Sequence, residues 1–211
     1  MSERIAKLSA PTSGLRFAPR QAIIGAMSSP DTYELSAAYM NGLVGAVRAG
    51  GFLDGALITM TEIERASYQQ PARQPWWDAR YAERLAATVG KVFGEWAVEQ
   101  VGYGVIAESI GPLVKGQIEQ ALASGAGPEA LFAHLSEMAK TAVRPLRTAW
   151  TQSGPGAGKL ELIYPRALEK ETQLLWRGAI KYAFELTHRD AGKIVNEVQG
   201  PPGHLTWEVS W

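Results

Sequence analysis

The spacing of apolar residues changes once along this chain, close to Arg144-Pro145. Before this point, apolar residues recur every three or four positions, as in residues 35–47, which is the period of an amphipathic helix. After it, short segments alternate apolar and polar residues, as in residues 204–211, which is the period of a strand. The chain therefore predicts an α+β fold, with an N-terminal helical half packed on an antiparallel sheet made of two hairpins flanking one helix.

Capping and turn residues predict where the helices of the first half begin and end. A first helix follows Ser29-Pro30-Asp31 and ends at Gly50-Gly51, and a long helix runs from about Trp76 to Val101. Two short helical pieces follow in residues 105–123, and another helix begins at Pro128. The short, β-branched segment 56–64 is compatible with either a strand or a helix.

The second half of the chain predicts two hairpins around one helix. Residues 145–150 and 159–164 alternate and are joined by a glycine-rich turn, and residues 193–199 and 204–211 flank a Gly-Pro-Pro-Gly turn. An amphipathic helix is expected between them, over residues 169–187.

The length of 211 residues and an apolar content of 46% suit one domain with its own core. We expect an N-terminal arm over residues 1–30 and a single domain over residues 31–211. Within that domain, residues 31–143 form the helical half and residues 144–211 the sheet half.

Composition excludes several classes of function. The 21 basic and 21 acidic residues balance and form no basic segment, so nucleic acid is not an expected partner. Absence of cysteine excludes disulfides, thiolate metal sites and a cysteine nucleophile. No run of about eighteen apolar residues predicts a membrane helix, and the N-terminus has no apolar signal segment. We therefore expect no membrane insertion and a cytoplasmic location.

Catalytic motifs are not found. Residues 154–159 are rich in glycine but lack the helix and the hydroxyl residue that a phosphate loop needs, and no G-x-S-x-G elbow occurs. The carboxylates of Glu108 and Glu161 are interpreted as surface charges, and the three histidines lack the spacing of metal ligands. The sequence therefore predicts a protein that is not an enzyme.

Two segments carry a family resemblance. Residues 92–96 (VFGEW) and 102–111 (GYGVIAESIG) resemble an aromatic helix followed by a glycine bend, and residues 160–186 resemble a strand, a basic residue and a helix, as found in haem-nitric-oxide/oxygen-binding (H-NOX) domains. Their haem-free relatives include the V4R domains and the core subunits of TRAPP tethering complexes. The resemblance covers residues from about 38 to 211 and implies the fold more than the function.

The resemblance raises the question of whether this chain binds haem. It implies a histidine ligand on the helix before the first hairpin, where His134 lies, and a Tyr-x-Ser-x-Arg string for the haem propionates. The corresponding residues are Leu162, Tyr164 and Arg166, so two of the three differ, and one alignment places Phe132 in the ligand position. We therefore predict a divergent haem-free bacterial member without a cofactor or metal. Haem on His134 is the alternative, and a half-buried histidine bonded to a neighbour is the simpler interpretation of that residue.

The leading functional hypothesis is a sensor or adaptor domain. It would bind a small apolar ligand between the helical and sheet halves and signal by protein association. Arg166 would lie at the edge of the cavity and pair with an acidic group of the ligand. The other residues expected to line the cavity are Trp96, Tyr103, Phe132, Leu135, Tyr164 and Trp176.

Two alternatives remain open at this point. One is a pure protein-interaction module without a ligand, which would act as a homodimer or scaffold, and the other is a haem-based gas sensor that uses His134. The partner is unknown, and Trp76, Trp77 and Trp211 are the residues expected at a pocket rim or subunit interface.

Overall fold

The computed structural model describes residues 32–69, 74–107, 120, 123, 127–187 and 192–211. The expected N-terminal arm and the two helical pieces expected in residues 105–123 lie largely outside this part of the chain. The elements of the helical half are β1 (Glu34–Ser36), α1 (Ala37–Ala49), α2 (Leu53–Ile58), α3 (Glu62–Gln69), β2 (Trp76–Asp78), α4 (Ala79–Phe93) and α5 (Glu95–Val105). The elements that follow are α7 (Pro128–Ala142), β3 (Val143–Arg144), β4 (Arg147–Gly154), β5 (Ala157–Ile163), α8 (Lys170–Leu186), β6 (Lys193–Gln199) and β7 (His204–Ser210).

The main sheet confirms the prediction of two hairpins. Its order is β4-β5-β7-β6 and every pair is antiparallel, so the first hairpin and the last hairpin lie side by side. Leu160 pairs with Trp207, and Leu162 pairs with Leu205. All four side chains are buried, because the alternating pattern directs them to the face that the helices cover.

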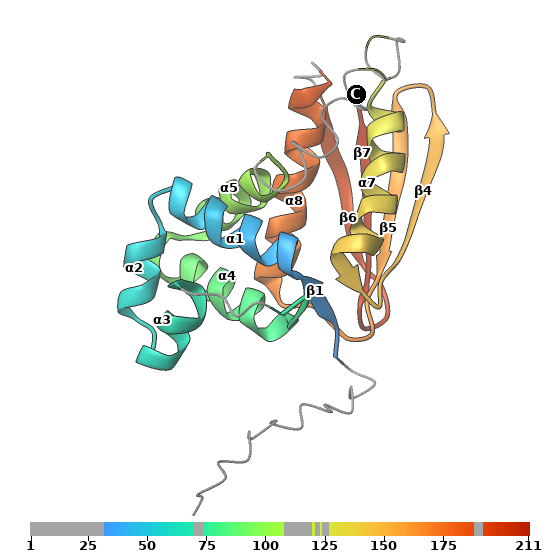
Figure 1. Ribbon diagram of the computed structural model, residues 1–211. Helices are drawn as coiled ribbons and strands as arrows, with labels where there is room; N and C mark the ends of the chain where they lie inside the picture. Colours follow the sequence, from blue (N-terminus) through green and yellow to red (C-terminus); the bar gives the residue numbers. More distant parts are fainter. Residues whose placement is uncertain (1–31, 70–73, 108–119, 121–122, 124–126, 188–191) are drawn as a thin grey trace, which may run out of the picture.

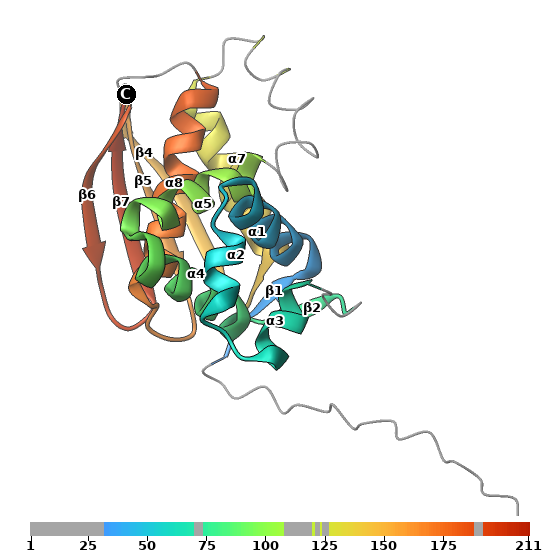
Figure 2. The same ribbon diagram turned by 90° about the vertical axis from the view of Figure 1, so that its left-hand side faces the viewer.

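The helices form two layers on that face of the sheet. Figure 2 shows α7 and α8 next to the sheet and α1, α4 and α5 beyond α8. In Figure 1, α8 therefore lies between the sheet and the helices of the first half. We use the word seam for the contact of α1, α4 and α5 with α8 and with the segment that follows β5.

The start of the first helix was predicted too early. Residues 34–36 form β1, and α1 begins at Ala37, where the side chain of Ser36 accepts a hydrogen bond from the Tyr39 amide. β1 lies between β2 and β3 in a small three-stranded sheet. These strands are only two or three residues long, and therefore too short for alternation to be recognised.

The prediction of one long helix over residues 76–101 is wrong, because this segment contains a strand and two helices. Residues 76–78 form β2, α4 ends at Phe93, and α5 begins at Glu95. Gly94 between the two helices has φ = 91°, a conformation that glycine adopts without steric cost. The helix α5 then continues to Val105 rather than ending at Gly102. The ambiguous segment 56–64 belongs to α2, the connection after it and the start of α3.

Two glycines bring α5 and α8 into direct backbone contact. A Cβ atom at Gly102 would lie 2.1 Å from the Leu175 carbonyl oxygen, and one at Gly178 would lie 2.0 Å from the Glu99 carbonyl oxygen. Real side chains do not reach such distances, so these positions require glycine for the two helices to pack as they do. The seam is therefore closed by main-chain contact over this stretch.

No helix in the described part of the chain has the length and apolar character to span a membrane.

Candidate functional site

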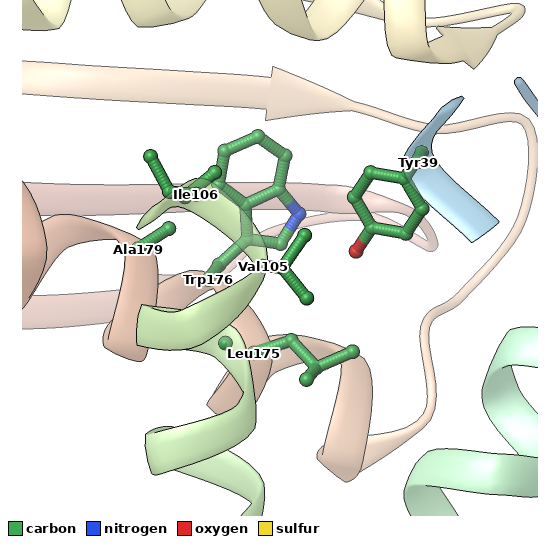
Figure 3. Close-up of a pocket in the computed structure, with 7 residues that line it drawn as sticks. Tyr39, Val105, Ile106, Leu175, Trp176 and Ala179 are labelled. Carbon is green, nitrogen blue, oxygen red and sulfur yellow. The ribbon is translucent and has the colours of Figure 1, made fainter. Parts of the chain in front are cut away.

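A small pocket lies at the seam, where α1, α5 and α8 meet. Its volume is about 20 Å³, and it is lined by Tyr39, Gly102, Val105, Ile106, Leu175, Trp176 and Ala179. Figure 3 shows the Trp176 indole and the Tyr39 ring on opposite sides, with the indole nitrogen on the side of Tyr39. Burial raises the pKa of Tyr39 to about 12. The space is close to that of one water molecule, well below the 300–1,000 Å³ of ordinary ligand pockets.

Tyr164 and Trp176 form a hydrogen bond beside this pocket. The Trp176 Nε1–H donates to Tyr164 Oη at 2.8 Å. Tyr164 is buried, and burial raises the pKa of its hydroxyl, so the phenol is neutral at physiological pH. The ring of Tyr33 packs edge-on against Tyr164 with centroids 5.0 Å apart. The sequence-predicted residues Tyr164 and Trp176 are thus brought together.

A partly buried ion pair joins the two halves at the other end of the seam. The Arg166 Nη2–H donates to Glu83 Oε2 at 2.5 Å, and the Tyr33 hydroxyl donates to Glu83 Oε1 at 2.7 Å. The Arg166 guanidinium also lies 5.2 Å from the centroid of the Tyr33 ring. We call these three residues the Arg166 clamp. It fixes the segment after β5 to α4 and to the residue that precedes β1.

The clamp lies at the edge of an open pocket of about 310 Å³. Its lining includes the three clamp residues and four others, which are Thr32, Asp78, Arg80 and Glu169. Asp78 binds Arg80 through both carboxylate oxygens. These hydrogen bonds lower the pKa of Asp78. Arg166, the other cation of this pocket, donates through Nη2 to Glu83 and through Nη1 to the carbonyl oxygen of its neighbour Ala167.

Phe132 lies in a separate aromatic cluster between α7, α8 and the sheet. Its ring stacks on Trp150 with centroids 4.8 Å apart and contacts Phe184 at 5.4 Å and Trp211 at 6.2 Å. Phe132 has no exposed surface, and Leu135, one turn further along α7, is also buried. Trp211, expected at an interface, packs partly buried in this cluster.

Tyr103 and Trp96 do not lie at the seam pocket, although both were expected in the ligand cavity. Tyr103 packs edge-on against Tyr182 at 5.1 Å, and burial, together with its hydrogen bond to Glu185, raises its pKa to about 12. Trp96 is 61% exposed and contacts Phe52 on the outer side of α5. The chain breaks at Gly94 and a new helix begins at Glu95. The apolar face of α4 therefore does not continue to Trp96, as the prediction of one long helix assumed.

The two neighbouring tryptophans of β2 have different environments. Trp77 is 4% exposed and packs on Tyr81, so it belongs to the core and does not form a pocket rim. Trp76 is half-buried beneath the Arg144 guanidinium, which lies 3.9 Å from its ring centroid. Arg144 in turn binds Glu34 at 2.8 Å.

His134 lies on α7 and is half-buried, with its Nε2 buried and without a hydrogen-bond partner in the described part of the chain. The sequence analysis interpreted His134 as a histidine bonded to a neighbour, but its Nε2 has no such partner in the described part of the chain. No group of three or more metal-binding side chains occurs among the described residues. His204, by contrast, lies near Glu161 on the sheet at 3.4 Å, and His188 lies outside the described residues.

The residues present do not fit the carboxylates of haem. Leu162 is buried in the sheet, Tyr164 is already bonded to Trp176, and Arg166 is already neutralised by Glu83. A dianionic group placed here would meet the Glu83 carboxylate, and the like charges would repel each other. The free nitrogen of His134 is compatible with a ligand role, but the anion-binding part of the site is not.

Glu83 and Tyr33 were missed by sequence reasoning. One signal for Glu83 was present, because it lies on the same face of α4 as Ala79 and Ala86, and all three are buried. An acidic residue in an apolar stripe requires a partner. The partner could not be inferred from the sequence, because Arg166 lies 83 positions away.

Comparisons with known proteins find a similarity of fold alone. No family model and no curated protein matches the sequence. The crystal structure of the Fe(II) unliganded H-NOX protein from K. algicida matches with a TM-score of 0.57 and 9% identity, over 83% of this chain and 96% of that one. The I5F mutant of the T. tengcongensis H-NOX protein matches with a TM-score of 0.52 and 13% identity, over 83% and 95% of the two chains. The chain therefore has the α+β fold of H-NOX proteins, as the sequence predicted.

Proposed function

We propose that this chain is a non-enzymatic signalling domain that uses the H-NOX fold without haem. The observation that carries the proposal is the hydrogen-bonded ion pair of Arg166 and Glu83. The cation that the family resemblance assigns to haem carboxylates here holds a carboxylate of the chain itself. Iron coordination by His134 alone would leave the propionates without that partner.

The ligand of such a domain would be small or would have to open the seam. The seam pocket of about 20 Å³ has space for about one water molecule. The contacts at Gly102 and Gly178 leave no space between α5 and α8. We propose that a larger apolar ligand would bind only after these helices separate. Signalling through a protein partner or a homodimer in the cytoplasm remains part of the proposal.

Hemin titration tests the absence of haem. We expect the purified wild-type protein to give the broad absorption of free hemin, with no sharp Soret band, and His134→Ala to give the same spectrum. The reason is that Arg166, the cation that the resemblance assigns to the propionates, is already paired with Glu83. His204→Ala is the matched control, because His204 lies on the sheet and not on α7.

A different pattern would contradict the proposal. If the wild type and His204→Ala gave a sharp Soret band that His134→Ala lost, the domain would bind haem through His134. The gas-sensor alternative would then replace the proposed function.

A further inference from the structure

We infer that the open pocket between α1 and α5 binds a neutral, planar heteroaromatic ring whose edge carries a hydrogen-bond donor beside an acceptor. Adenine is a ring of this class, and adenosine is its soluble probe. This pocket shares no lining residue with the seam pocket. The inference therefore goes beyond the proposed function and holds whether or not the seam opens.

The pocket has the size of a site for a small ligand. Its volume is about 300 Å³, at the lower end of the range of ordinary ligand pockets. Small residues create this space at the point where α1 and α5 come close, since a Cβ atom at Gly104 would lie 3.0 Å from the Ala46 Cβ. The lining residues are Ala46, Ala49, Gly50, Phe52, Trp96, Gln100 and Gly104.

Trp96 provides an aromatic surface that the fold holds in place. Its side chain is 61% exposed, and its ring packs edge-on against Phe52 with centroids 5.5 Å apart. Phe52 is itself buried and packs on Phe93. An exposed indole that is supported by a buried ring offers a surface on which a planar ring can stack.

Gln100 supplies a polar group beside that surface. It lies four residues after Trp96 on α5, so the two side chains share one face of the helix, and both line the pocket. The exposed Gln100 amide carries a C=O acceptor and N–H donors. A glutamine amide can form two hydrogen bonds with the adjacent donor and acceptor of adenine. A ring stacked on Trp96 would therefore be selected by its edge.

The pocket favours a ligand without charge. Among the described residues that line it, none is charged. Glu95 and Glu99, which precede Trp96 and Gln100 along α5, bind basic side chains of α8. A phosphate or carboxylate of the ligand would leave water without gaining an ionic partner here. The recognised group is therefore the ring itself.

NMR titration of the full chain with adenosine tests the inference. The Nε1–H signal of Trp96 is identified by its loss in Trp96→Phe. We expect this signal to shift with a Kd on the order of 1 mM, because an open site gains little beyond one stacked ring and two hydrogen bonds. Trp96→Ala, followed on the adenosine signals, should bind at least about fivefold more weakly. Ile63→Ala is the control with unchanged affinity, because Ile63 is exposed but does not line the pocket.

Purine riboside, which lacks the amino group of adenosine, tests recognition of the edge. The wild type should bind adenosine about three- to tenfold more tightly than purine riboside, as expected for one additional hydrogen bond. Gln100→Leu should bind the two compounds equally. AMP should bind no more tightly than adenosine, because the pocket offers its phosphate no cation.

Ala49→Leu is a second variant that leaves Trp96 in place. The larger side chain would occupy part of the pocket and should weaken adenosine binding as Trp96→Ala does. The inference would be overturned by an unchanged Trp96 signal at about ten times the expected Kd, or by equal affinity in the wild type and both variants. Equal affinity of the wild type for adenosine and purine riboside would exclude recognition of the edge, and much tighter binding of AMP would exclude the neutral ligand class.

Discussion

Gly178→Ala should lower the free energy of unfolding by about 3 kcal/mol or more, at the upper end of what overpacking costs. The new Cβ would lie 2.0 Å from the Glu99 carbonyl oxygen and 2.6 Å from the Tyr103 amide nitrogen. Both atoms belong to the main chain of α5, so no side-chain rotation relieves the overlap. The two helices would have to separate and expose the seam. Urea unfolding followed by circular dichroism measures the loss.

The matched control is Gly45→Ala in α1. A Cβ at Gly45 meets nothing within 4 Å, so the higher helix propensity of alanine should stabilise that variant by up to about 1 kcal/mol. Gly102→Ala should resemble Gly178→Ala, because its Cβ would lie 2.1 Å from the Leu175 carbonyl oxygen. Closure of the seam by main-chain contact would be refuted if Gly178→Ala gained stability as Gly45→Ala does.

The sheet half was predictable because its patterns are local. The alternation of residues 204–210 predicted that Leu205, Trp207 and Val209 are buried, and all three are in the core. Thr206, which the alternation assigned to the polar face, is also buried. Pro128 marked the start of α7, and the apolar spacing of residues 169–187 placed α8 to within a residue at each end. In each case the deciding signal lies within the element itself.

The helical half was less predictable because the ends of its elements depend on backbone conformation and on pairing with distant strands. Gly94 is one of several glycines in the sequence, and nothing in its neighbours indicates that this one has a positive φ. A continuous helix through Gly94 extends the apolar stripe of α4 to Trp96, which the actual break places on the surface. The strand β1 depends on pairing with β2 and β3, both distant in sequence.

The candidate site could be predicted only in part for the same reason. Aromatic content and the family resemblance pointed to Tyr164, Arg166 and Trp176, and the structure places all three along the seam. What decides their chemistry is the partner of each polar group. Glu83 and Tyr33 reach Arg166 through the tertiary fold, so no sequence spacing reports them.

Phe132→Ala should lower the free energy of unfolding by about 3–5 kcal/mol. The ring is fully buried and touches Trp150, Phe184 and Trp211. Its removal leaves a cavity between the sheet and both of the helices that cover it, and a rigid aromatic cluster closes only partly around such a gap. Chemical denaturation of the purified variant measures the change.

Ile63→Ala is the control for loss of an apolar side chain, because Ile63 is 83% exposed and its truncation should change stability by no more than about 0.5 kcal/mol. Phe132→Leu should be milder than Phe132→Ala, since it keeps more of the buried volume.

The comparison of Phe132→Ala with Ile63→Ala also separates two roles for Phe132. A residue that lines an empty ligand cavity loses few contacts when truncated, whereas one packed in the core loses many. A change as small in Phe132→Ala as in Ile63→Ala would therefore contradict the packed cluster and restore Phe132 to the ligand cavity predicted from the sequence.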